Sequence, residues 1–234
     1  MAKIVSGIFL LLSCFLVYAP GVTAQALKVG ITSKTLFYLP YYLAQKKGFY
    51  AGENLKVELV LIGRSDVQLQ ALISGDLHFG SLNTDGVIVI NEKGDNLKVI
   101  AGVDNSAPYI LIGGKAYKRI DDLKGAKLGV SSLRGGGTSI LLDYLKSKGL
   151  HHPRDFTMVV VSGGTSARLT ALESGAIAGA VLGIPYSDIA IDQGFNRLGD
   201  TLEVIPVYQF NAVTINPAWA EKNRANVVRF LKAH

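Results

Sequence analysis

The sequence has few of the side chains that act as thiol nucleophiles or soft metal ligands. Its 234 residues include one cysteine, Cys14, and four histidines. Because Cys14 lies in the predicted leader described below, the mature chain has no internal disulfide, thiolate nucleophile or Cys-ligated zinc. The histidines also lack the i, i+4 spacing of helical metal sites; they are His78, His151, His152 and His234. We therefore expect no cofactor and no metal.

Charged residues are also scarce, and they form no basic run. Charged residues make up 18% of the chain and hydrophobic residues 49%, a composition typical of a globular α/β protein. The formal net charge is +6 at pH 7. Without a basic cluster this excess predicts no nucleic-acid partner. It fits an anionic ligand, and equally a solvated basic surface.

The first residues have the pattern of an export signal. Lys3 precedes the uncharged stretch 4–19, and a small-residue cleavage pattern ends at Ala24. The apolar run is shorter than the roughly 20 residues of a membrane-spanning helix. We predict a signal peptide over 1–24 and a periplasmic mature protein. A lipoprotein anchored at Cys14 is the alternative, but the apolar stretch 15–18 replaces the polar tether expected after it.

The mature chain alternates strand and helix patterns in two successive units, which predicts parallel α/β sheets. The first unit, 25–110, has predicted strands at 27–32, 56–62, 77–80, 97–103 and 108–112, with helices at 37–47, 65–73 and 83–91. The second unit, 111–210, has predicted strands at 127–130, 156–161, 176–182 and 202–205, with helices at 136–148, at 165–174 and after Pro185. A strand at 208–215 and helices after Asn216 return the chain to the first unit over 211–234.

The last predicted helix has an apolar face that needs a partner. Val227, Val228 and Leu231 lie on one side of it, three residues before the sequence stops. This pattern predicts that a C-terminal part of the protein is missing from the sequence.

Several segments, taken in order along the chain, resemble one family. They are 38–50 with Asn54-Leu55, 70–80, 122–130, 171–176 with Pro185, and 216–219. They resemble the periplasmic solute-binding proteins of nitrate, sulfonate, taurine and bicarbonate importers and the related NMT1/THI5-like binders of a thiamine pyrimidine precursor. The resemblance implies a two-lobed type II periplasmic binding protein fold. Each lobe would be a mostly parallel sheet flanked by helices, with two crossovers near 105–115 and 206–211.

The resemblance also implies a function. The chain would be the monomeric solute-binding component of an ABC-type uptake system, with a membrane permease and its ATPase as partners. The solute would be a small anionic, zwitterionic, or aromatic or heterocyclic molecule, bound between the lobes without chemical change. Two alternatives stay open: a dehydratase or transferase on the same fold with Asp85 as its acid or base, and a sensor input domain.

Candidate binding residues follow the strands, because ligands of open α/β sheets bind beyond the carboxyl ends of the strands. In the first unit they are Ser33, Lys34, Tyr38, Asn83, Thr84 and Asp85. The same polar residues could simply cap the following helices, and Asp85 would favour a helix N-terminus without any ligand. A carboxylate there mildly favours a zwitterionic or heterocyclic solute.

In the second unit the candidates lie in glycine-rich helix starts. Glycines let backbone N–H groups approach a ligand, and a helix N-terminus attracts an anion. The candidates are Ser131, Arg134, Gly137, Thr138, Ser139, Gly164, Pro185 and Tyr186. Phosphate transfer is not implied, because no lysine stands where the Walker pattern requires one. An ordinary turn before a helix is the alternative for the loop 131–139, and a helix start with a packed aromatic is the alternative for Pro185 and Tyr186.

Overall fold

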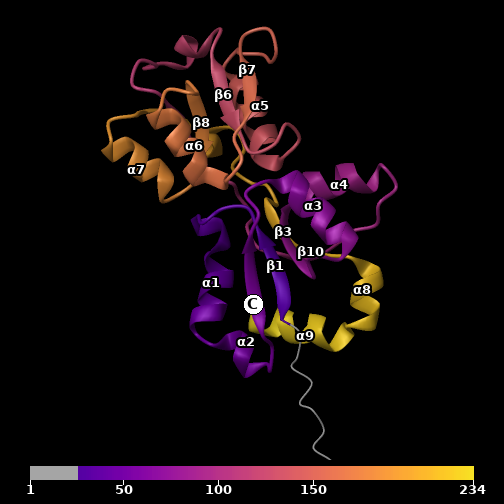
Figure 1. The fold of residues 1–234 in the computed structure, drawn as a ribbon. Helices are drawn as coiled ribbons and strands as arrows, with labels where there is room; N and C mark the ends of the chain where they lie inside the picture. The colour runs from indigo at the N-terminus through magenta and orange to yellow at the C-terminus, as the bar shows by residue number, and fades with distance from the viewer. Residues whose placement is uncertain (1–25) are drawn as a thin grey trace, which may run out of the picture.

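The structure is a computed structural model that describes residues 26–234, so the predicted signal peptide and Cys14 lie outside the described residues. The described chain forms two lobes, each built on one five-stranded sheet. Figure 1 shows lobe 2 above lobe 1, with the chain passing between them. Within residues 26–234, no helix is both long and apolar enough to cross a membrane.

Lobe 1 contains the first sheet, in which four of five strands run the same way. The order is β2 (Val57–Leu61), β1 (Leu27–Ile31), β3 (Phe79–Asn83), β10 (Asn211–Ile215) and β4 (Lys98–Gly102). Strand β1 pairs in parallel with β2 and β3, whereas β10 runs antiparallel between β3 and β4. The helical elements are η1 (Leu36–Tyr38), α1 (Leu39–Lys46), α2 (Phe49–Gly52), α3 (Ser65–Ser74), α4 (Thr84–Asn91), α8 (Pro217–Lys222) and α9 (Arg224–Ala233).

Lobe 2 repeats this arrangement. Its strand order is β7 (Thr157–Val160), β6 (Lys127–Val130), β8 (Gly179–Leu182), β5 (Ile110–Gly113) and β9 (Asn196–Asp200), with β5 antiparallel between β8 and β9. The helical elements are η2 (Ile120–Leu123), α5 (Gly136–Ser147), α6 (Gly164–Glu173), α7 (Tyr186–Asp192) and η3 (Thr201–Glu203). The two mostly parallel sheets confirm the predicted α/β fold.

Two crossover segments, 103–109 and 204–210, connect the lobes and pair with each other. Tyr208 N donates to Asn105 O at 2.9 Å, and Phe210 N donates to Asp104 O at 2.8 Å. Thr201 Oγ1 adds a buried bond to Ala107 O at 2.7 Å. We call these paired segments the hinge ribbon. Their hydrogen bonds hold the hinge residues in register beside the space between the lobes.

The strand predicted over 202–205 is wrong. The strand of this region is β9, and a 3-10 turn, η3, follows it. The carboxylate of Asp200 accepts from Leu202 N at 3.0 Å, which caps the turn at the point where the strand was expected to begin. β9 contains no β-branched residue, so its pairing with β5 decides its conformation and local propensity does not.

The predicted apolar face of the last helix is only partly buried. Val228 and Leu231 are 47% and 37% exposed, whereas Phe230 is fully buried. The ring of Phe230 stacks on Phe79 of β3 at 3.9 Å and lies 5.4 Å from the ring of Tyr50. Helix α9 therefore contacts lobe 1 through a side adjacent to the predicted one.

Candidate functional site

The two lobes meet through the loops that follow the carboxyl ends of their parallel strands. Four hydrogen bonds join them directly: Ser65 Oγ with Ser132 Oγ at 3.1 Å, Gly136 N to Asn83 Oδ1 at 3.3 Å, Ser139 Oγ to Asp85 Oδ2 at 3.0 Å, and Leu36 N to Ile184 O at 3.0 Å. The lobes are thus in contact, and we call this conformation closed. The predicted helix starts of both units face one junction.

A small polar cavity, here called the cleft cavity, lies at this junction. Its volume is about 20 Å³, little more than the ~10–15 Å³ that one water molecule needs on the same scale. A solute of several atoms can therefore enter only when the lobes separate. The cavity is lined by Thr32, Ser33, Tyr38, Ser65, Asn83, Tyr109, Ser131, Gly137, Gly164, Thr165, Arg168 and Phe210.

Arg168 supplies the only charge among the residues that line the cleft cavity. It lies on α6, is 5% exposed, and donates from Nη2 to Thr165 Oγ1 at 3.0 Å. Its Nε is buried without a hydrogen-bond partner. Burial lowers the pKa of this guanidinium, because desolvation disfavours the charged form. An anion placed in the cavity would offset that cost.

Two helix N-termini that follow glycine N-cap residues add positive potential at the cavity. Helices α5 and α6 begin after Gly135 and Gly163, which have no capping side chain, and neither helix has an acidic residue in its first turn. At α5, Gly136 N donates to Asn83 Oδ1 of lobe 1. By contrast, Asn216 caps α8. Gly164 has a φ of +80°, and a Cβ there would lie 2.5 Å from Thr32 O. Only glycine fits this contact between α6 and the loop after β1.

Aromatic side chains from η1 and the hinge ribbon support the cavity. Phe37 lies 5.0 Å, ring to ring, from both Tyr109 and Phe210, with edge-to-face geometry. Tyr38 Oη lies 2.5 Å from Thr32 Oγ1. Burial raises the pKa of Tyr38 and of Tyr109, so both phenols stay neutral and can donate hydrogen bonds.

The structure divides the predicted binding residues into three groups. One group lines the cleft cavity: Ser33, Tyr38, Asn83, Ser131, Gly137 and Gly164. A second group joins the lobes or stabilises local backbone: Asp85 and Ser139 bond to each other, Thr84 bonds to Gln209 O at 2.6 Å, and Thr138 bonds to Ser132 O at 2.6 Å. The third group lies outside the cavity: Lys34, Arg134, Pro185 and Tyr186.

Local geometry explains why the third group lies outside. Ser33 is buried toward the cavity, and the next side chain, Lys34, is exposed at a surface hollow beside β2. Arg134 lies at the exposed tip of a loop whose neighbours, Ser132 and Gly135, contact Ser65 of lobe 1. Tyr186 packs against the core of lobe 2 beside the exposed Pro185.

Arg168, Thr32, Ser65, Tyr109, Thr165 and Phe210 also line the cavity but were not among the predicted binding residues. A signal for Arg168 was present in the sequence, because it falls on the same face of α6 as the buried residues Thr165, Leu169 and Leu172. An arginine on a buried helix face without an acidic partner is unusual. Tyr109 and Phe210 lie in the hinge ribbon, and only the fold brings them to the cavity.

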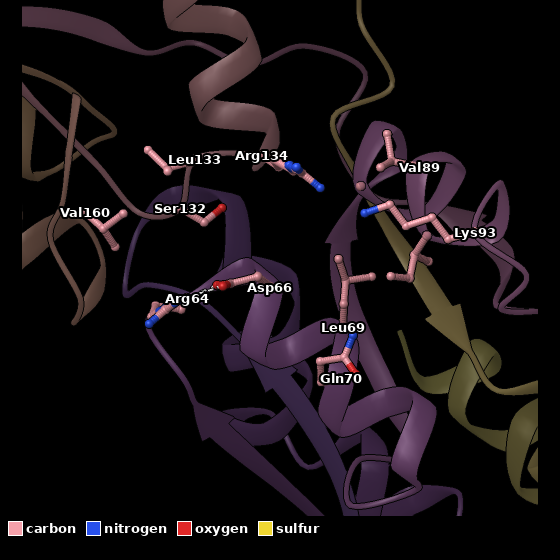
Figure 2. Close-up of a pocket in the computed structure, with 12 residues that line it drawn as sticks. Arg64, Asp66, Leu69, Gln70, Val89, Lys93, Ser132, Leu133, Arg134 and Val160 are labelled. Carbon is pink, nitrogen blue, oxygen red and sulfur yellow. Dashed lines mark hydrogen bonds and ion pairs between the residues drawn. The ribbon is translucent and has the colours of Figure 1, made fainter. Parts of the chain in front are cut away.

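A larger hollow, the outer groove, opens at the surface between α3, α4 and the loop 131–135. Its volume is about 360 Å³. Figure 2 shows the nitrogen ends of Arg134 and Lys93 facing each other across it. Arg64 already pairs with Asp66 at 2.5 Å, and both side chains are more than one third exposed. The charges of the groove are therefore solvated or paired, unlike that of Arg168.

Within residues 26–234, no group of three or more histidine, cysteine and acidic side chains is arranged to hold a metal ion. Asp85, the acid or base of the enzyme alternative, accepts hydrogen bonds from Ser139 Oγ at 3.0 Å and from Gly86 N at 2.9 Å. In the structure, Asp85 therefore forms one hydrogen bond between the lobes and another at the start of α4.

Asp104 of the hinge ribbon makes stability depend on pH. Burial raises the pKa of its carboxyl to about 6, and the hydrogen bond from Asn211 partly offsets this rise. Between the unfolded pKa of about 3.9 and 6, the folded state binds more protons than the unfolded state. The free energy of unfolding therefore falls as pH rises through this window.

We expect Asp104→Asn to remove this pH dependence. The wild type should lose ~1–2 kcal/mol relative to the variant between pH 4 and pH 7, a value discounted for solvent screening of a half-buried group. Urea unfolding of both proteins at pH 4 and pH 7 measures the difference. Equal changes in the two proteins would contradict the assignment.

Two α/β lobes, joined by paired crossovers and closing on a polar cavity at the ends of their strands, define a periplasmic binding protein fold. The NMT1/THI5-like family model matches residues 37–234, and the chain belongs to this family. YtlA of Bacillus subtilis, named as a candidate binding protein, is 23% identical over 234 residues, which cover 94% of this chain and 69% of YtlA.

Solved structures show the same fold. The alkanesulfonate-binding protein SsuA of Xanthomonas axonopodis pv. citri, bound to MOPS, has a TM-score of 0.73 at 20% identity, covering 89% of this chain and 71% of SsuA. The nitrate-binding protein NrtA of Synechocystis has a TM-score of 0.75 at 17% identity, covering 89% of this chain and 60% of NrtA. These similarities confirm the predicted family and fold.

Proposed function

We propose that this chain is the solute-binding component of an ABC-type uptake system and that it captures a small molecule in the cleft between its lobes. One observation carries the proposal: polar loops and helix starts from both lobes line one small polar cavity beside a hinge. The family and the binding proteins of similar structure support it.

Binding in this proposal is coupled to closure about the hinge ribbon. The solute enters between separated lobes, and the hydrogen bonds between the lobes re-form around it. A micromolar dissociation constant requires about 8 kcal/mol. Charge-assisted hydrogen bonds supply about 1.5–3 kcal/mol each, so a few of them, together with the exclusion of water, reach that value.

Export and delivery complete the proposed function. The mature protein would begin after Ala24 and work in the periplasm, where the closed form presents both lobes to a membrane permease. A ligand screen by thermal shift, followed by calorimetry, tests the binding step. Mass spectrometry of the recovered solute tests the enzyme alternative, because a binding protein returns the solute unchanged.

We expect Asp85→Arg and Ser139→Arg each to weaken binding of the best solute by at least ~10-fold. Each substitution removes the bond between Asp85 and Ser139 and places a large cation where the lobes meet. Glu92→Arg, which makes the same charge change as Asp85→Arg at an exposed position just after α4, is the control. Circular dichroism checks folding. Unchanged affinity in both junction variants would contradict binding between the lobes.

A further inference from the structure

We infer that the cleft cavity is a receptor for a small oxyanion, such as a carboxylate or nitrate-sized head group, and that Arg168 is its counter-charge. This inference rests on the proposed function and names the class of solute. It assigns the binding charge to a residue of α6 at the centre of the junction.

The first argument is the missing partner of a buried cation. Arg168 is 5% exposed, its Nε has no hydrogen-bond partner, and its Nη2 bonds only to the neutral hydroxyl of Thr165. A buried charge without a partner is costly, and buried arginines are normally paired with an anion. No acidic side chain lines the cavity. An oxyanion from outside the chain would complete the pair.

The second argument is the chemistry of the rest of the cavity. Its polar lining consists of hydroxyls, one carboxamide and backbone N–H groups, which can all donate hydrogen bonds to an anion. The uncapped start of α6 adds the positive end of a helix of 10 residues beside Arg168. These groups come from both lobes, so an anion at Arg168 would favour closure.

The third argument is size. The cavity of the closed form measures about 20 Å³, little more than one water molecule needs, so a group bound there must be compact, and the lobes must close less fully around it than in this structure. A guanidinium binds planar oxyanions through two parallel hydrogen bonds.

The test uses two variants. Arg168→Met removes the charge and keeps a long unbranched side chain. Arg168→Lys keeps the charge but loses the planar set of N–H donors of the guanidinium. Binding of formate, acetate and nitrate is measured by calorimetry and thermal shift. Acetamide, the uncharged analogue of acetate, is the control ligand. We expect the wild type to prefer acetate to acetamide, and Arg168→Met to bind the best anion about 10- to 100-fold more weakly. Arg168→Lys should lie between the two.

Arg229→Met, at an exposed position of α9, is the matched control and should bind like the wild type. If a neutral or cationic solute closes the lobes while no anion binds, the inference is wrong and the proposed function stands. If Arg134→Met loses anion binding and Arg168→Met retains it, the anion binds in the outer groove and the inference is also wrong. If no solute of any charge binds the wild type, the proposed function fails, and the inference fails with it.

Discussion

Gly63→Ala is expected to hold the lobes apart and to weaken solute binding by at least ~10-fold. Gly63 contacts Gly163 of lobe 2 so closely that a Cβ on Gly63 would lie 2.8 Å from both Gly163 Cα and N. Real Cβ atoms do not approach backbone atoms this closely. The added methyl group therefore clashes with lobe 2 only in the closed conformation, and the variant should still fold, with its lobes open.

A matched control separates this effect from backbone strain. Gly48 and Gly63 both have a φ of +77°, but a Cβ on Gly48 would have no atom within 4 Å. Gly48→Ala and Gly63→Ala should each lose about 1–2 kcal/mol of stability, the usual cost of a left-handed alanine. Only Gly63→Ala should show a larger radius of gyration by small-angle X-ray scattering in the presence of solute. Equal affinities in the two variants would show that Gly63 and Gly163 need not meet for binding.

The sequence predicted which loops lie where the two lobes meet, because loops that follow the carboxyl ends of parallel strands share one edge of a sheet. It did not predict which way each side chain points. Ser33 and Lys34 are neighbours in the loop after β1, yet only Ser33 lines the cavity. A loop lacks the regular period of a helix or strand, so the orientation of its side chains depends on tertiary contacts.

The glycine-rich loop before α5 has a second feature that could not be predicted from the sequence alone. Its glycines correctly indicated a close approach to the backbone, which we assigned to a ligand. In the structure a Cβ on Gly135 would lie 2.6 Å from Ser65 Oγ, and a Cβ on Gly136 would lie 2.6 Å from Asn83 Cγ. The close neighbours are side chains of lobe 1, so these two glycines permit closure. Only the fold could reveal this, because the contact joins residues that are more than 50 positions apart.

Arg168 shows why the charge of a candidate site could be assigned to another residue. Sequence reasoning favoured Arg134, because it stands in a glycine-rich loop before a helix. The structure exposes Arg134 and buries Arg168, one turn into α6. Its position on the buried face of α6 could be read from the sequence, but that position does not show that Arg168 lines the cavity between the lobes.

Arg168→Met is expected to stabilise the protein in the absence of oxyanions while it weakens anion binding. The fold without ligand holds a buried guanidinium whose Nε has no partner and whose pKa is lowered by burial. Methionine fills a similar space without a charge to desolvate, and replacing buried charges by apolar side chains is often stabilising by about 1–4 kcal/mol. Each kcal/mol corresponds to about 2–4 °C in the melting temperature of a protein of this size.

Differential scanning calorimetry in buffer without oxyanions measures this effect, with Arg229→Met as a surface control that should stay within about 0.5 kcal/mol of the wild type. Added nitrate or acetate should raise the melting temperature of the wild type and leave that of Arg168→Met unchanged. A purely structural arginine would give the opposite result, since its removal would lower the melting temperature at every anion concentration. A gain in stability combined with a loss of anion response is therefore specific to a binding residue whose counter-charge comes from the solute.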